Sequence, residues 1–174
     1  MHRNLFNTME NEEIERKFLV VDNRFIEESI GHYDIVQGYI CRMPGRTIRI
    51  RHRLGSDGTE IAKLTIKAAP KTADSITRFE WERDITAADF KALLGLCDGI
   101  PILKTRYIIP AKTAANSAHD EKTELQWEVD VFHGRHEGLV LAEIELPSED
   151  TAFAKPEWLG KEVTDNPQYY NANM

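Results

Sequence analysis

Hydrophobic and polar residues alternate along most of this chain, in short runs that predict β-strands. Successive side chains of a strand point to opposite faces of its sheet, so alternation indicates a strand with two unlike faces. Residues 124–132 are typical, because Leu125, Trp127 and Val129 alternate with acidic or amide side chains. Segments of this kind, rich in β-branched and aromatic residues, are expected strands. They span residues 13–20, 34–42, 47–53, 60–67, 77–85, 102–109, 124–132 and 139–146.

Helical patterns are fewer. Residues 86–97 have an N-cap candidate, Thr86, followed by apolar residues near helical spacing. Residues 22–31 and 148–155 are expected as short helices, the second with acids in its first turn. Two small, polar segments, 71–77 and 112–122, predict surface loops between strands.

Eight strands with short connections favour a closed barrel or a sandwich. The charged faces consist mostly of Glu and Arg, and some strands carry one sign, such as the arginines of 47–53 and the carboxylates of 139–146. A half-exposed sheet with solvated charges would also alternate, and stays the simpler alternative. We expect a mainly β protein: an eight-stranded antiparallel closed barrel, with a few covering helices and its charged faces turned inward.

An interior of this kind is costly unless each charge is paired or binds a ligand. Arginine binds phosphate oxygens through two parallel hydrogen bonds, and carboxylates bind hard divalent cations such as Mg²⁺ and Mn²⁺. A metal polyphosphate meets both requirements. The charge pattern therefore favours a polyphosphate site that also uses divalent cations.

The composition fits one soluble domain. The chain has 174 residues and no apolar run near the roughly 18 residues that cross a bilayer. Its net charge of −7 argues against general nucleic-acid binding. Cys41 and Cys97 show no disulfide or metal pattern and are expected as reduced thiols. We expect a cytoplasmic protein with a loose leader at 1–10, a single domain at 11–174, and no membrane partner.

The run Glu13-Ile14-Glu15-Arg16-Lys17 resembles the ExExK signature of the CYTH family, also called triphosphate tunnel metalloenzymes. Alone this motif is weak, but further segments resemble family motifs and follow in family order. They are 37–39 (QGY), 47–51 (TIRIR), 64–67 (LTIK), 78–82 (RFEWE), 104–107 (KTRY), 128–132 (EVDVF), 142–145 (AEIE) and 158–164 (WLGKEVT).

The resemblance implies an eight-stranded tunnel acting on triphosphate groups with Mg²⁺ or Mn²⁺. Short bacterial-type members are commonly tripolyphosphatases, so the expected reaction is hydrolysis of inorganic tripolyphosphate with release of phosphate. Adenylate cyclase, thiamine triphosphatase and a polyphosphate or nucleotide sensor without turnover are the alternatives. The resemblance also implies a C-terminal plug of the tunnel, which would be short here, and a homodimer remains open.

The resemblance also implies residue roles. Glu13, Glu15, Glu143 and Glu145 are the first expected metal ligands, because the first and last strands of a closed barrel are neighbours. Another set of acids would hold a second ion or orient basic side chains. These are Glu80, Glu82, Glu128 and Asp130.

Phosphate binding is expected from the basic residues of the motifs, with Lys63 either adding a contact or lying at the rim. The motif residues are Lys17, Arg49, Arg51, Arg78, Lys104 and Arg106. Tyr39 and Lys67 match a catalytic pair that assists the attacking water, although Tyr39 could equally be a packed strand tyrosine. The histidines form no metal-ligand pattern.

Overall fold

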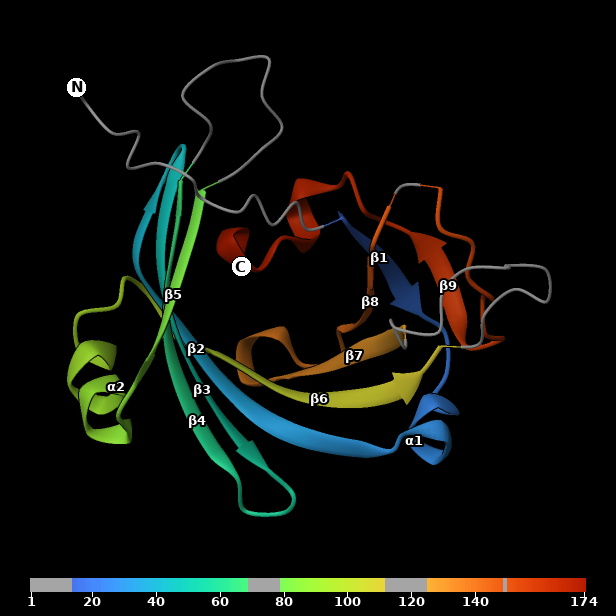
Figure 1. Cartoon of the computed structure of the whole chain (residues 1–174), viewed down its shortest axis with the longest axis horizontal. Coiled ribbons are helices and arrows are strands. Elements are labelled where there is room, and N and C mark those ends of the chain that lie inside the picture. The colour runs from blue at the N-terminus through green and yellow to red at the C-terminus, as the bar shows by residue number, and fades with distance from the viewer. Residues whose placement is uncertain (1–13, 69–78, 112–124, 149) are drawn as a thin grey trace, which may run out of the picture.

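The computed structural model describes residues 14–68, 79–111, 125–148 and 150–174. Its main element is one strongly curved antiparallel sheet (Figure 1). The strands are β1 (Ile14–Val20), β2 (Gly31–Met43), β3 (Arg46–Gly55), β4 (Glu60–Ala68), β5 (Phe79–Ile85), β6 (Ile102–Pro110), β7 (Gln126–His133), β8 (Val140–Leu146) and β9 (Leu159–Glu162). They pair in the order β5-β4-β3-β2-β6-β7-β8-β1-β9.

The prediction of an eight-stranded closed barrel is wrong in strand number and in closure. Strands β1 and β8 do pair, as expected of the first and last predicted strands. Closure would then require β5 to pair with the other edge of β1, but β9 occupies that edge. Within the described residues β5 and β9 are therefore the free edges of an open sheet.

The ninth strand went unrecognised because it is short and has no alternating apolar run. Close approach of its backbone to β1 depends on Gly160, where a Cβ atom would lie 2.9 Å from the carbonyl oxygen of Leu19. Strand β9 therefore forms because its backbone can approach that of β1 closely, and hydrophobic alternation does not predict such an approach.

Helix α2 (Ala87–Leu94) confirms the expected helix, and Thr86 is its N-cap. The Thr86 side chain accepts a hydrogen bond from the Asp89 N–H, and the Asp89 side chain accepts one from the Thr86 N–H. Helix α1 (Phe25–Glu28) is one turn within the predicted 22–31. No helix in the described part of the chain is long and apolar enough to cross a membrane.

The prediction of a helix at 148–155 is wrong for the residues of this segment that the structure describes. Ser148 and Thr151 form a local turn, with the Thr151 N–H donating to the Ser148 carbonyl oxygen at 3.1 Å. Phe153 then packs edge-on against Trp127, 5.4 Å between ring centroids, so tertiary packing outweighs the helical signal. Residue 149, the leader at 1–10 and the loops expected at 71–77 and 112–122 lie outside the described residues.

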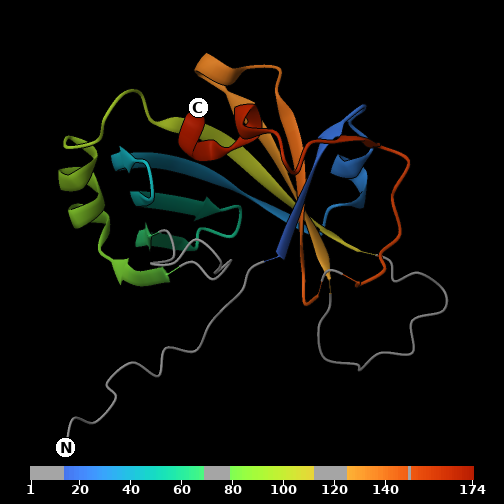
Figure 2. The ribbon, with the colours of Figure 1, turned by 90° about the horizontal axis from the view of Figure 1, so that it is seen from above.

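The strand registers place most of the charged strand residues on one face of the sheet, as the alternation predicts. Cross-strand partners share a face. Arg51 lies opposite Lys63, Lys17 opposite Glu143, and Arg106 opposite Asp130. This face is the concave one, because α2 packs on the opposite side of β3 and β4, outside the curve (Figures 1 and 2).

Apolar clusters cover the convex face. Phe90 of α2 packs with Ile50 and Ala62 of the sheet. A larger cluster around Phe18, Trp127 and Trp158 packs on the other half of the sheet. These clusters confirm that the apolar strand faces are covered by helices and connecting segments.

A third apolar cluster lies on the concave side. Tyr39, Phe132 and Leu141 are buried there, and the C-terminal segment packs on them through Tyr169 and Met174. This segment contains the short 3-10 turns η2 (Pro167–Tyr169) and η3 (Asn171–Asn173), whereas η1 (Gly134–His136) joins β7 to β8. The C-terminal end lies between the two halves of the sheet (Figures 1 and 2).

Candidate active site

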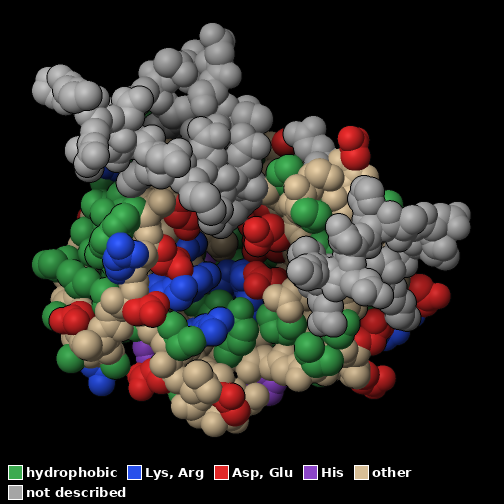
Figure 3. Space-filling view, viewed as in Figure 1, with side chains coloured by type: hydrophobic (Ala, Val, Ile, Leu, Met, Phe, Trp, Pro, Cys, Tyr) green, Lys and Arg blue, Asp and Glu red, His purple; other side chains and the backbone are tan. Residues whose placement is uncertain are grey.

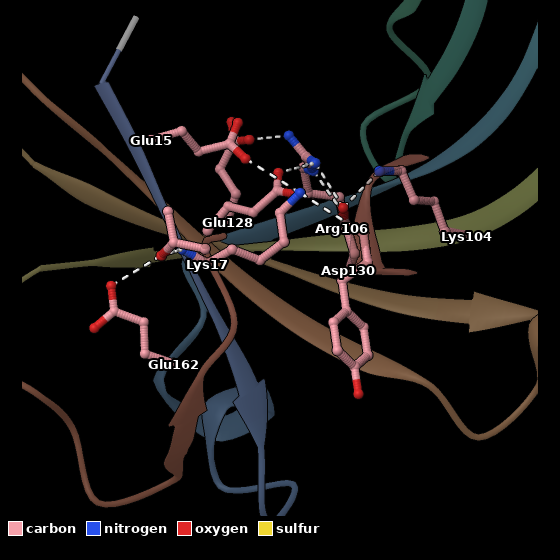
Figure 4. Close-up of polar contacts among 10 residues, drawn as sticks. Glu15, Lys17, Lys104, Arg106, Glu128, Asp130 and Glu162 are labelled. Atoms are coloured by element: carbon pink, nitrogen blue, oxygen red, sulfur yellow. Dashed lines mark hydrogen bonds and ion pairs between the residues drawn. The ribbon is translucent and has the colours of Figure 1, made fainter. Parts of the chain in front are cut away.

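Basic side chains gather at the centre of the concave face, with carboxylates beside them (Figure 3). Arg106 of β6 is the hub of this cluster and is only 7% exposed. Its Nε and Nη2 atoms each donate to an oxygen of Asp130 at 2.6 Å, and Nη2 also donates to Glu143 at 3.0 Å. Nη1 donates to Glu128 (Figure 4). Burial opposes this charge, but the carboxylates outweigh burial and raise the pKa of Arg106.

Lys104 lies deeper, beside the same carboxylate. Its Nζ atom donates to Asp130 Oδ2 at 2.5 Å. Burial lowers the pKa of Lys104, and Asp130 offsets part of that effect. For Asp130 itself, burial is outweighed by Arg106 and Lys104, which together lower its pKa to about 2. One carboxylate therefore holds two cations in place.

Strands β1 and β8 carry those of the first expected metal ligands that the structure describes, Glu15, Glu143 and Glu145. Glu15 lies opposite Glu145, and Lys17 lies opposite Glu143 in the register. Lys17 Nζ is 2.8 Å from Glu143 Oε1 and 3.2 Å from Glu15 Oε1. The Glu15 side chain keeps 47% of its area exposed. Burial within the groove, and then the charge of Glu143, raise the pKa of Glu15.

The opposite wall, on β3 and β4, is basic. Arg49 Nη2 donates to Thr65 Oγ1 at 3.1 Å, while its buried Nε atom has no partner in the described residues. Arg51 donates no hydrogen bond to any described residue. Burial and the neighbouring charges of Arg49 and Arg106 lower the pKa of Arg51 to about 10. An anionic ligand would relieve this repulsion.

The proposed catalytic pair is on the same face, but its members are not in contact. Tyr39 lies opposite Arg49 and Lys67 lies opposite Thr47, so β3 runs between them. The Tyr39 hydroxyl accepts a hydrogen bond from Gln37 Nε2 at 3.1 Å, and burial raises its pKa. Lys67 Nζ is 2.8 Å from Glu80 Oε2.

The structure thus brings most predicted site residues onto the concave face. The exceptions, Glu13 and Arg78, lie outside the described residues. The gathered residues are Glu15, Lys17, Tyr39, Arg49, Arg51, Lys67, Glu80, Glu82, Lys104, Arg106, Glu128, Asp130, Glu143 and Glu145. Cys41 and Cys97 are both free thiols, as predicted.

Sequence reasoning missed Arg42. A register shift between Tyr39 and Cys41 moves Arg42 onto the concave side. Its guanidinium lies 4.6 Å from the Tyr39 ring centroid, and Nη1 donates to the carbonyl oxygens of Ala172 and Met174. The only sequence signal is that Arg42 breaks the alternation set by Gln37 and Tyr39.

A second missed feature explains the WLGKEVT segment. Arg16 on the convex side donates through Nε to Glu162 at 2.8 Å and forms an ion pair with the same carboxylate through Nη2. Thr164 Oγ1 donates to Glu162 and accepts a hydrogen bond from the Lys17 N–H. This clamp fixes the backbone of β1 where Lys17 enters the groove.

The carboxylates suit a hard divalent cation by their chemistry, because Mg²⁺ and Mn²⁺ take oxygen ligands. In the described part of the chain, no three Asp, Glu, His or Cys side chains converge closely enough to hold one ion. Most acids are paired with basic groups instead. Glu15, whose side chain is 47% exposed, and Glu145, which has no ion pair with any described residue, are the donors most available to a cation.

The fold and the site define a class of protein: a curved antiparallel sheet whose concave groove suits a polyanion together with divalent cations. The CYTH domain family model matches residues 11–172. An inorganic triphosphatase of Acetivibrio thermocellus is 36% identical over 163 residues, covering 93% of this chain and 92% of the relative. One of Nitrosomonas europaea is 34% identical over 161 residues, covering 91% and 93%. This chain belongs to the CYTH family.

Solved structures agree on the fold. A crystal structure of an inorganic triphosphatase matches with a TM-score of 0.59 and 30% identity, covering 92% of both chains. A putative adenylyl cyclase from Hippeastrum matches with a TM-score of 0.51 and 12% identity, covering 78% of this chain and 80% of that one. The second match supports the fold alone.

Proposed function

We propose that this protein hydrolyses inorganic tripolyphosphate in its concave groove and releases phosphate, using Mg²⁺ or Mn²⁺. The names of its relatives, identical at 34–36% across more than nine-tenths of the chain, support this substrate. The structural observation that carries the proposal is the basic wall facing the carboxylate strands, in which Arg51 has no acidic hydrogen-bond partner among the described residues. We assign residues 11–174 to one catalytic domain.

Phosphoryl transfer needs positioning and charge neutralisation more than covalent chemistry. Lys17, Arg49, Arg51 and Arg106 would bind phosphate oxygens, because all four lie on the concave face of the sheet. Lys104 is 2% exposed and paired with Asp130, so it would act mainly by holding Asp130, which in turn orients Arg106. Arg78 would join the phosphate-binding set.

Glu15, Glu143 and Glu145 would hold the divalent cation, with Glu13 beside them. The bound ion would polarise the scissile phosphoryl group and neutralise its charge. Before it binds, Lys17 neutralises Glu143 and Glu15. Once Glu15 and Glu143 hold the cation, Lys17 would be free to turn toward phosphate. Glu80, Glu82 and Glu128 would orient basic side chains.

Tyr39 and Lys67 would orient the attacking water. Burial raises the pKa of Tyr39, so its phenol stays protonated at neutral pH and can donate a hydrogen bond. A phenol in this state is not a base. The water would instead lose its proton to a carboxylate or to bulk solvent.

The test is phosphate release from tripolyphosphate with Mg²⁺, Mn²⁺ or EDTA, for wild type, Glu15→Gln and a control, Glu157→Gln, whose side chain is 85% exposed. Metal-dependent release that Glu15→Gln loses and Glu157→Gln keeps supports the proposal. ATP and thiamine triphosphate are run in parallel, with cyclic AMP measured. Turnover of one of these, but not of tripolyphosphate, would overturn the substrate assignment.

A further inference from the structure

A pocket lies on the concave face of β3, β4 and β5, toward the turn that joins β3 to β4. It has a volume of about 290 Å³ and is lined by Arg51, Arg53, Ile61, Lys63 and Asp84. Three of these side chains are basic and one is acidic, so the lining has an excess of positive charge. Of the three, only Arg51 belongs to a motif of the family signature.

Arg53 has no acidic partner of its own within the described residues. Its guanidinium lies over the Tyr33 ring, 4.9 Å from the centroid, which fixes its orientation without neutralising its charge. The pKa of the nearby Asp57 is lowered chiefly by the Thr59 N–H, and Arg53 contributes least. Arg53 therefore keeps its hydrogen-bond donors for a ligand.

Of the two acids in this region, Glu82 is paired with Lys63 and Asp84 is exposed, so neither pairs with Arg53. Glu82 accepts hydrogen bonds from Lys63 at 2.5 Å and from Thr65 at 2.9 Å. Asp84 lies opposite Lys63 at the exposed end of β5. The pocket is therefore prepared for an anion rather than for a cation, unlike the carboxylate strands across the groove.

The pocket is continuous with the basic wall through Arg51. The charge of Arg106 at the hub lowers the pKa of Arg51, so the two side chains are near each other. Arg53 lies two residues further along the same face of β3. The other end of the concave face is filled by Tyr39, Phe132 and the C-terminal segment. The row of cations thus runs from the hub toward the end of the groove that no described segment fills.

We propose that Arg53 and Lys63, with Arg51, form an additional phosphoryl-binding subsite at the β3–β4 end of the groove. Its ligand is a phosphoryl oxyanion, supplied either by the distal phosphoryl group of a bound linear triphosphate or by free orthophosphate. The subsite deepens the proposed function and rests on it for the identity of the substrate. A planar guanidinium stacked on an aromatic ring presents paired donors that match phosphate oxygens.

The test measures ligand binding without turnover, by calorimetry on the full chain in EDTA. Orthophosphate and tripolyphosphate are titrated separately into wild type, Arg53→Gln and Arg83→Gln. Arg83 is the matched control, because it has the same charge, stacks on Trp81 at 5.4 Å and lies on the convex face of β5. Lys63→Gln is a second test of the pocket, should Arg53→Gln fail to fold.

Loss of a charge-assisted contact should weaken tripolyphosphate binding about tenfold in Arg53→Gln and in Lys63→Gln, but not in Arg83→Gln. If orthophosphate also binds wild type and is lost in Arg53→Gln, free phosphate is a ligand. If only tripolyphosphate responds, the ligand is the distal phosphoryl group. Wild-type affinity for both ligands in folded Arg53→Gln and Lys63→Gln would overturn the subsite.

Failure of the proposed function gives a different result. Wild type would then bind tripolyphosphate in EDTA, through Arg53, yet release no phosphate with any divalent cation. That outcome leaves the subsite standing and refutes the hydrolase.

Discussion

Lys104 Nζ lies 2.5 Å from Asp130 Oδ2, and the two side chains are only 2% and 1% exposed. The same carboxylate also accepts two hydrogen bonds from Arg106. Asp130 is therefore the anion that makes it possible for two cations to lie side by side beneath the groove. Removing it would leave both cations buried without their main counter-ion.

Asp130→Asn should be strongly destabilising at neutral pH. Breaking a buried ion pair by removing one partner costs about 3–5 kcal/mol. The free energy of unfolding from urea titration measures this, with the exposed Asp98→Asn as the control. A loss below about 1 kcal/mol, as for a surface pair, would contradict the central role of Asp130.

Acid stability should also depend on Asp130. Its pKa is lowered from 3.8 to about 2, so its ionised form is favoured by folding. The stabilisation is complete above 3.8 and is lost as the pH falls toward about 2, because the unfolded chain then binds a proton that the folded chain does not. In Asp130→Asn, unfolding free energies across this window should fall less steeply than in wild type. An unchanged slope would assign the acid lability to other carboxylates.

Alternation along the strands predicted which residues share the charged face, because the period of a strand fixes the side to which each side chain points. It could not predict depth. Lys104 and Arg51 are both basic residues on the charged face of an alternating strand. Lys104 is nevertheless buried against Asp130, whereas Arg51 donates no hydrogen bond to a described residue. Depth depends on how the strands curve over one another, which the pattern within a single strand does not contain.

Closure of the sheet could not be predicted for a related reason. The expected β1–β8 pairing is present, but the edge of β1 that would close a barrel pairs with β9. That pairing depends on Gly160 and on the Arg16–Glu162 clamp, and neither is part of the hydrophobic alternation by which strands were predicted. Arg42 was missed because a register shift reverses its face.

Gly38→Ala should destabilise the protein through α2. A Cβ atom at Gly38 would lie 2.5 Å from Cys97 Sγ and 3.2 Å from its Cβ, so turning the thiol away does not clear the contact. Overpacking of this kind costs about 1–3 kcal/mol. Gly31→Ala is the control, because nothing lies within 4 Å of its added Cβ.

Thermal unfolding of Gly38→Ala, Cys97→Ala and the double variant checks this explanation. The double variant should lose less stability than the sum of the single variants, because removing the thiol makes room for the methyl group. Simple additivity would show that Gly38 is needed for another reason.

Glu162→Gln should loosen the attachment of β9 to β1. The Arg16–Glu162 pair is about one-third exposed, so its contribution to stability is at most about 1 kcal/mol. For a chain of this length that corresponds to a fall in Tm of about 2–4 °C. Glu157→Gln, which removes the exposed partner of Arg24, should leave Tm unchanged. Equal changes in Tm for the two variants would show that the Arg16–Glu162 pair contributes no more than an ordinary surface ion pair.

Divalent-cation binding should depend on pH through Glu15. Burial and then Glu143 raise the pKa of this carboxyl, so part of it is protonated at a pH where an ordinary Glu is ionised. A carboxylate must lose its proton to bind a metal, so affinity for Mg²⁺ should fall about tenfold for each pH unit below the raised pKa. Calorimetric titration from mildly alkaline to acidic pH measures this, and proton release on binding should rise as the pH falls.

Glu15→Gln should bind Mg²⁺ more weakly and with a flatter pH dependence, whereas the exposed Glu137→Gln should match wild type. Tight binding by Glu15→Gln would instead assign the cation to other acids of the groove, such as Glu80 and Glu82.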